Sequence, residues 1–148
     1  FLAELEPAAR RDGLALPLLL GIAKQESRFS PAVRSPVGAV GLLQLMPETA
    51  AELAGGAIST SELENPGRNA ELGGRYLAQL LAQWGNDPLL AVASYNAGPG
   101  AVQGWLGPRL RQMPELWVEA IPYPETRHYV KKVLGNAWSY QSPRRPAC

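Results

Sequence analysis

Hydrophobic residues recur at helical spacing in several stretches of the chain. Between residues 69 and 84 they fall on one broad face of a predicted helix, namely Leu72, Tyr76, Leu77, Leu80, Leu81 and Trp84. With proline and glycine taken as segment ends, the pattern predicts further helices over residues 2–12, 17–27, 47–54, 88–97, 101–106, 114–120 and 124–140. Residues 30–41 and 55–68 are expected to form loops.

Helix-start signals and composition support this division. Asp87 precedes Pro88, so an acidic N-cap is followed by a proline at the first helical position. Pro17 opens its helix in the same way. Leucine and alanine together outnumber valine, isoleucine and threonine about threefold, which favours helix over sheet. We therefore expect a mainly α-helical chain with at most a small β-hairpin.

Length and charge limit the classes of protein to which this chain can belong. The 148 residues predict one domain over residues 1–148, with a flexible tail at residues 141–148. The chain begins at Phe1 instead of methionine, so we expect a piece of a longer protein. The net charge of +1 does not indicate nucleic-acid binding. Hydrophobic runs are shorter than the roughly 18 residues that a membrane-spanning segment needs.

The chain has one cysteine, Cys148, and one histidine, His128. Zinc sites made of clustered cysteine and histidine are excluded, and so is a disulfide framework. We therefore expect no metal and no organic cofactor. His128 is expected to have a surface or packing role in the last helix. Trp105, beside a glycine-rich turn, is a candidate for stacking on a sugar, although tryptophan is more often a core residue.

The most informative residue is Glu26. In a helix that begins near Pro17, it shares an arc of roughly 100° with Leu19, Ile22 and Ala23, which is expected to face the core. Burial disfavours an ionised carboxylate, and so does the negative end of the helix dipole. Both effects raise the pKa of this carboxyl group, as a general acid near neutral pH requires.

A less specific interpretation of Glu26 stays open. A glutamate near a helix end is most often solvated, and this one could pair with Arg28 or Arg34. The chain also lacks an obvious second carboxylate of the kind most glycosidases use, because Asp12 and Asp87 look like turn or capping residues.

Four sequence blocks occur in the order in which one enzyme family has them. They are residues 25–31 (QESRFSP), 35–47 (SPVGAVGLLQLMP), 94–100 (SYNAGPG) and 121–130 (IPYPETRHYV). Together they resemble the catalytic domain of soluble lytic murein transglycosylases. The family usually has methionine where Leu43 stands and aspartate where Leu16 stands.

The resemblance implies a lysozyme-like α+β superfamily fold, a helical domain with at most a small β-hairpin flanking a substrate cleft. It implies that Glu26 is the single catalytic acid and base. It also implies a set of residues that line the cleft or lie near the saccharide: Ser35, Gln44, Met46, Tyr95, Asn96 and Glu125.

The activity implied by the resemblance is cleavage of peptidoglycan between N-acetylmuramic acid and N-acetylglucosamine, without water and with 1,6-anhydromuramoyl ends. The expected partners are peptidoglycan glycan strands, and the expected state is a monomer. The expected location is the bacterial cell envelope, periplasmic or exported. The alternatives are a hydrolytic muramidase similar to goose-type lysozyme, an inactive peptidoglycan-binding module and a generic helical interaction domain.

Overall fold

The computed structural model describes residues 1–106 and 118–141 and is mainly helical, as expected. Its helices are α1 (Leu2–Arg11), α2 (Leu16–Ser27), α3 (Pro47–Ala54), α4 (Thr60–Glu64), α5 (Pro66–Gln83), α6 (Pro88–Ala97), α7 (Pro99–Trp105) and α10 (Pro124–Gln141). Over the described ranges, β structure is limited to two isolated antiparallel bridges, Arg34 with Val40 and Val40 with Leu45. This is less than the small β-hairpin that was expected at most, and the first bridge lies inside the loop expected over residues 30–41.

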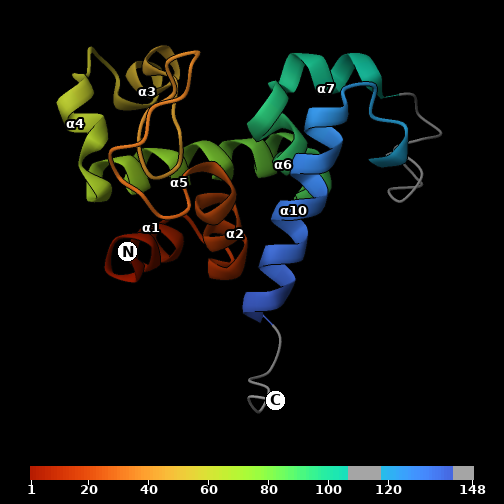
Figure 1. Ribbon diagram of the computed structural model, residues 1–148, viewed down its shortest axis with the longest axis horizontal. Helices are drawn as coiled ribbons and strands as arrows, with labels where there is room; N and C mark the ends of the chain where they lie inside the picture. Colours follow the sequence, from red (N-terminus) through yellow and green to blue (C-terminus); the bar gives the residue numbers. More distant parts are fainter. Residues whose placement is uncertain (107–117, 142–148) are drawn as a thin grey trace.

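Helix α5 crosses the middle of the molecule, and α1, α3, α4 and α6 all pack against it (Figure 1). Helix α10 packs against α2 and α6, so the first and last parts of the chain lie side by side. Buried side chains from these elements form a hydrophobic cluster that includes Leu5, Ile22, Leu72 and Val130. Burial of each large aliphatic side chain contributes about 1.5–3 kcal/mol. This core holds α2 and α10 together, and both helices carry residues of the site.

The prediction of a loop over residues 55–68 is wrong, because α4 and the start of α5 lie there. Ser59 and Glu62 form a capping box in which each side chain bonds the backbone N–H of the other residue. Asn65 then caps α5, and Pro66 stands at its first position, three residues before the expected start. Parts of two other expected elements, residues 114–117 and 142–148, lie outside the described residues.

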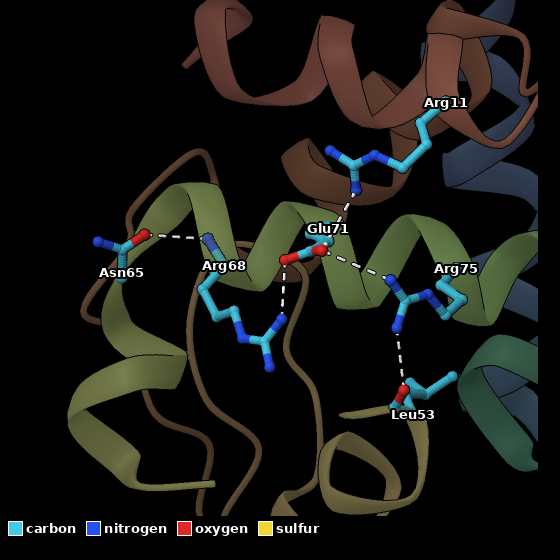
Figure 2. Close-up of polar contacts among 6 residues, drawn as sticks. All are labelled: Arg11, Leu53, Asn65, Arg68, Glu71 and Arg75. Atoms are coloured by element: carbon cyan, nitrogen blue, oxygen red, sulfur yellow. Dashed lines mark hydrogen bonds and ion pairs between the residues drawn. The ribbon is translucent and has the colours of Figure 1, made fainter. Parts of the chain in front are cut away.

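An ionic cluster connects three helices around Glu71 (Figure 2). The Glu71 carboxylate pairs with Arg68 at 2.8 Å, with Arg75 at 3.4 Å and with Arg11 of α1 at 3.6 Å. The hydrogen bond from Arg68, with the charges of all three arginines, holds the pKa of Glu71 below its usual value. Arg75 also donates to the backbone oxygen of Leu53, near the end of α3, at 2.9 Å. The cluster thereby fixes α3 and α1 relative to α5.

In the part of the chain that the structure describes, no helix combines the length and the apolar character needed to cross a bilayer.

Candidate active site

Glu26 lies in the last turn of α2 and is half-buried against α10. Its Oε2 accepts a hydrogen bond of 2.9 Å from the hydroxyl of Tyr129 on α10. The two helices approach closely because Gly21 has no side chain, and a Cβ atom there would lie 2.7 Å from the backbone oxygen of Val133. This contact holds the helix faces close enough for the Tyr129 hydroxyl to reach the carboxylate.

The environment of Glu26 favours its protonated form. Its pKa is raised from 4.5 to about 7, chiefly because burial removes water from the charged carboxylate. The hydrogen bond from Tyr129 acts in the opposite direction, and the negative charge of Glu125 adds to the rise. The raised pKa predicted from helical periodicity is thus confirmed. With a pKa near 7, the same group can donate a proton and then accept one at neutral pH.

The alternative in which Glu26 is neutralised by a nearby arginine is not seen among the described residues. Arg34 instead pairs with Glu64 at 3.1 Å, and Arg28 makes no ion pair with Glu26. Glu26 therefore has a phenol, and not a cation, as its polar partner.

Gln44 lies in the loop between α2 and α3, in a backbone conformation that L-residues rarely adopt, with φ of 50°. Its side-chain amide donates to the backbone oxygens of Val33 and Gly41, both at 2.9 Å. These bonds fix the side chain and leave its carbonyl oxygen as an acceptor for a ligand. Such strain at a backbone position is typical of binding sites.

The loop that carries Gln44 is anchored by Asn69 of α5, which is fully buried. The Asn69 amide donates to the backbone oxygens of Val40 and Leu63 and accepts from the backbone N–H of Leu43 at 2.7 Å. The loop is therefore attached to the helical core by side-chain bonds in place of a β-sheet.

Four of the residues expected to contact the saccharide line one pocket of about 230 Å³, which we call the Gln44 pocket. Its walls come from the loop, α3, α5 and α6: Gln44, Leu45, Met46, Thr49, Tyr76, Tyr95, Asn96, Ala97 and Gly98. The side chains of this wall are uncharged, and several are amides or hydroxyls. Such a lining suits a neutral, hydrogen-bonding ligand.

Tyr95 connects this pocket to Glu26. Its hydroxyl donates to the backbone oxygen of Leu43 at 2.8 Å, and its ring packs against Tyr76 with centroids 5.2 Å apart. Burial, and next the negative charge of Glu26, raise the pKa of Tyr95 far above its usual value. Because its proton is committed to Leu43, Tyr95 can only accept a hydrogen bond from a ligand.

Asn96 is oriented by Thr126 of α10, whose hydroxyl donates to Asn96 Oδ1 at 2.7 Å. The amide nitrogen of Asn96 is thereby left as a donor at the pocket wall. Thr126 and Tyr129 stand in the fourth sequence block, but the sequence analysis gave neither a role, and both bond residues of the candidate site. Each bonds a residue at least 30 positions away, so no local spacing could indicate it.

The remaining expected residues, Glu26 among them, do not line the Gln44 pocket. Ser35 accepts a hydrogen bond from the backbone N–H of Ala39 at 3.0 Å within its own loop, and its contact with a saccharide stays a prediction. Glu125 is exposed in the first turn of α10, within electrostatic reach of Glu26. Trp105 packs edge-to-face on exposed Tyr123, with centroids 5.0 Å apart, and His128 is exposed.

Three or more histidine, cysteine or acidic side chains do not come together anywhere in the described ranges in a way that could hold a metal ion.

Comparison with known proteins adds a family match. Residues 5–117 match the family model of the transglycosylase SLT domain. The soluble lytic murein transglycosylase of Escherichia coli K12 is 44% identical over 121 residues, which cover 78% of this chain and 19% of that protein. A putative soluble lytic murein transglycosylase of Haemophilus influenzae is 35% identical over 127 residues, covering 82% of this chain and 21% of the relative.

Solved structures agree with these matches. An inactive mutant of the lytic transglycosylase Slt from Pseudomonas aeruginosa aligns with a TM-score of 0.88 and 42% identity, over 93% of this chain and 23% of that one. A complex of the 70-kDa soluble lytic transglycosylase with bulgecin A aligns with a TM-score of 0.90 and 37% identity, over 95% and 24%. The chain thus spans about a fifth to a quarter of these relatives.

Proposed function

Because the chain belongs to the transglycosylase SLT domain family, as its four sequence blocks indicated, we propose that it is a peptidoglycan lytic transglycosylase. The bond that it cleaves is the β-1,4 linkage between N-acetylmuramic acid and N-acetylglucosamine. The observation that carries this proposal is Glu26, a half-buried carboxyl group with a pKa of about 7. Its charge acts on Tyr95, which lines the Gln44 pocket and its neutral hydrogen-bonding groups.

In the first step Glu26 acts as a general acid. Its proton passes to the glycosidic oxygen, and the bond between that oxygen and C1 of the muramoyl residue breaks. The N-acetyl carbonyl oxygen of the same sugar stabilises the positive charge that develops at C1, as in substrate-assisted glycosidases. This chemistry requires one protonated carboxyl group and no nucleophile from the protein, which fits the uncharged wall of the Gln44 pocket.

In the second step the Glu26 carboxylate acts as a base. It accepts the proton of the muramoyl C6 hydroxyl, the C6 oxygen forms a bond with C1, and the carboxyl group regains its proton. The product has a 1,6-anhydro ring, and no water is consumed. An intramolecular nucleophile acts at a high effective concentration, provided that the sugar is held in place.

The residues of the Gln44 pocket hold the sugar in this proposal. Gln44 accepts, Asn96 donates and Tyr95 accepts hydrogen bonds, since the remaining capacity of each side chain is set by its protein partners. Met46 supplies an apolar wall of the pocket. Ser35 and Glu125 do not line the pocket, and in this proposal they contact parts of the saccharide beyond it. We propose that the chain acts as a monomer. The substrate places the activity in the bacterial cell envelope.

Mass spectrometry of digested peptidoglycan tests the reaction. We expect muramoyl ends that are lighter than reducing ends by the mass of one water. Reducing ends would instead identify a hydrolytic muramidase and overturn the second step.

The role of Glu26 is tested by Glu26→Gln, which keeps the size of the side chain and removes the transferable proton. We expect kcat to fall by a factor of about 10²–10⁴, which is the usual contribution of a general acid, while glycan binding and the fold are retained. Binding is measured by titration with soluble strands and the fold by circular dichroism. Undiminished cleavage would refute the assignment, and binding without cleavage by the unsubstituted chain would identify a binding module.

A further inference from the structure

A second pocket, of about 240 Å³, adjoins the Gln44 pocket and has a different chemical character. We call it the Glu52 pocket, and its lining residues are Thr49, Glu52, Leu53, Tyr76 and Gln79. Thr49 and Tyr76 also line the Gln44 pocket, so the two share a wall between α3 and α5. A strand bound in one pocket therefore has parts that reach the other.

Glu52 is the charged group of this pocket. Its side chain is exposed, and no ion pair to it occurs within residues 1–106 and 118–141. The charge acts on the pocket wall, because it adds to the effect of burial in raising the pKa of Tyr76. Thr49 and Gln79 supply neutral hydrogen-bonding groups, and Leu53 supplies apolar surface.

A nearby arginine has other partners. Arg75 of α5 reaches the backbone oxygen of Leu53, next to Glu52 in sequence (Figure 2). Its guanidinium group also pairs with Glu71 at 3.4 Å, inside the ionic cluster around that residue. The Glu52 carboxylate is thus left without a cation from this cluster and faces a pocket that a ligand can enter.

We propose, on the premise of the function proposed above, that the Glu52 pocket binds a primary ammonium group carried by the peptidoglycan strand, with the Glu52 carboxylate as its counter-ion. The alkyl part of such a group packs on Leu53, and neighbouring amides bond to Gln79 and Thr49. Two parts of a strand can carry this chemistry. One is a free amino group of the peptide attached to the muramoyl residue, and the other is an amino sugar that has lost its acetyl group.

The test measures equilibrium binding of soluble peptidoglycan fragments in the Glu26→Gln background, so that no cleavage occurs. Fragments are used untreated, fully N-acetylated with acetic anhydride, or stripped of peptide. Glu52→Gln is expected to weaken binding of untreated fragments about two- to fivefold, the range for an exposed ion pair. The difference shrinks at high salt, because the pair is exposed. Acetylation of the fragments removes the difference between the two proteins.

The three fragment preparations distinguish the two possible sources of the ammonium group. If removal of the peptide abolishes the effect of Glu52→Gln, the ammonium group lies on the peptide. If the effect survives that removal and disappears after acetylation, the group lies on a sugar. Either result supports the proposal.

Glu48→Gln is the matched control, since Glu48 is an exposed glutamate of the same helix that lines neither pocket. Its binding should match that of the background protein. Glu52→Lys, which reverses the charge, should weaken binding more than Glu52→Gln does. The inference is contradicted if binding is equal with and without the Glu52 carboxylate, or if acetylation of the fragments leaves the difference unchanged. Neither outcome contradicts the proposed function. A background protein that binds none of the fragments contradicts the proposed function as well.

Discussion

At the scale of single residues, the chemistry of Glu26 depends on opposing influences. Burial and the charge of Glu125 favour the protonated acid, while the hydrogen bond from Tyr129 favours the carboxylate. Tyr129 is itself buried, and its own pKa is raised far above its usual value, chiefly by burial and then by the charge of Glu26. It therefore remains a neutral hydrogen-bond donor over the whole useful pH range. The balance leaves the pKa of Glu26 near the pH at which one group can serve as both acid and base.

Tyr129→Phe removes the hydrogen bond that favours the ionised form of Glu26. The pKa of Glu26 should rise, because the carboxylate loses a donor and stays buried. The limb of the pH profile of kcat/KM on which activity falls with rising pH should then move to higher pH. Tyr95→Phe is the control, since the Tyr95 hydroxyl bonds Leu43 and not Glu26, and its limb should not move. A limb that moves to lower pH in Tyr129→Phe would contradict this account.

Glu125→Gln should move the same limb in the opposite direction. It removes a negative charge that opposes ionisation of Glu26, so the pKa of Glu26 falls and the loss of activity begins at lower pH. The measurement is again kcat/KM against pH, at low salt where exposed charges are least screened. Glu119→Gln serves as the control because the Glu119 carboxylate pairs with Lys131 at 2.6 Å and does not act on Glu26. If the limb does not move in Glu125→Gln, the charge of Glu125 does not raise the pKa of Glu26.

Some residues of this site could be predicted from the sequence, and others could not. Glu26 could be identified because a carboxylate on a hydrophobic helix face violates the local pattern. Gln44, Met46, Tyr95 and Asn96 came from the family resemblance, and the structure brings them to one pocket. Tyr129 stands in the fourth sequence block but was given no role, because its contact with Glu26 spans 103 positions and depends on how α2 and α10 pack.

At the scale of elements, the loop before α3 is held by side chains that belong to the core. Asn69 bonds two backbone groups of this loop and the backbone oxygen of Leu63 in α4. Gly73 of the same helix contacts Leu43 so closely that a Cβ atom would overlap its side chain. Helix α5 thereby sets the position of Gln44 and Met46, which form one wall of the Gln44 pocket.

Asn69→Ala is expected to lower the free energy of unfolding by about 2–4 kcal/mol, because it leaves the buried N–H of Leu43 without its partner and removes two further bonds. Chemical denaturation followed by circular dichroism measures the change. Gln83→Ala, at an exposed position of the same helix, should stay within about 0.5 kcal/mol of the unsubstituted chain. If the two variants are equally stable, Asn69 does not anchor the loop.

Helices that begin with a strong local sequence signal could be predicted. The short helix α4 and the tertiary bonds of the loop could not. Pro47 and Pro88 mark helix starts that the structure has at the same positions, and Asp87 caps α6 as expected. Helix α4 has five residues, too few for a hydrophobic pattern, and depends on the capping box of Ser59 and Glu62 and on burial of Leu63. The bonds that attach the loop to Asn69 are tertiary, so spacing along the chain does not reveal them.

At the scale of the whole molecule, the acid needed for catalysis conflicts with stability. The folded chain keeps Glu26 in a setting that opposes its ionisation, whereas the unfolded chain exposes it to water. Above neutral pH the folded state must therefore hold a partly buried charge whose polar partner is a neutral phenol. The proposed catalytic role of Glu26 therefore comes at the expense of stability.

The pH dependence of stability follows from the raised pKa. An acid whose pKa is higher in the folded state contributes stability that is fully present below the unfolded value of 4.5 and is lost as the pH rises through about 7. At about 1.4 kcal/mol per pKa unit, the loss approaches about 3 kcal/mol. The free energy of unfolding of the unsubstituted chain should thus fall, relative to that of Glu26→Gln, as the pH rises from 4 to 8. Urea denaturation at each pH measures the free energy of unfolding of both proteins. A constant difference between the chain and Glu26→Gln would mean that Glu26 has an ordinary pKa, and the acid assigned to the reaction would then be ionised at neutral pH.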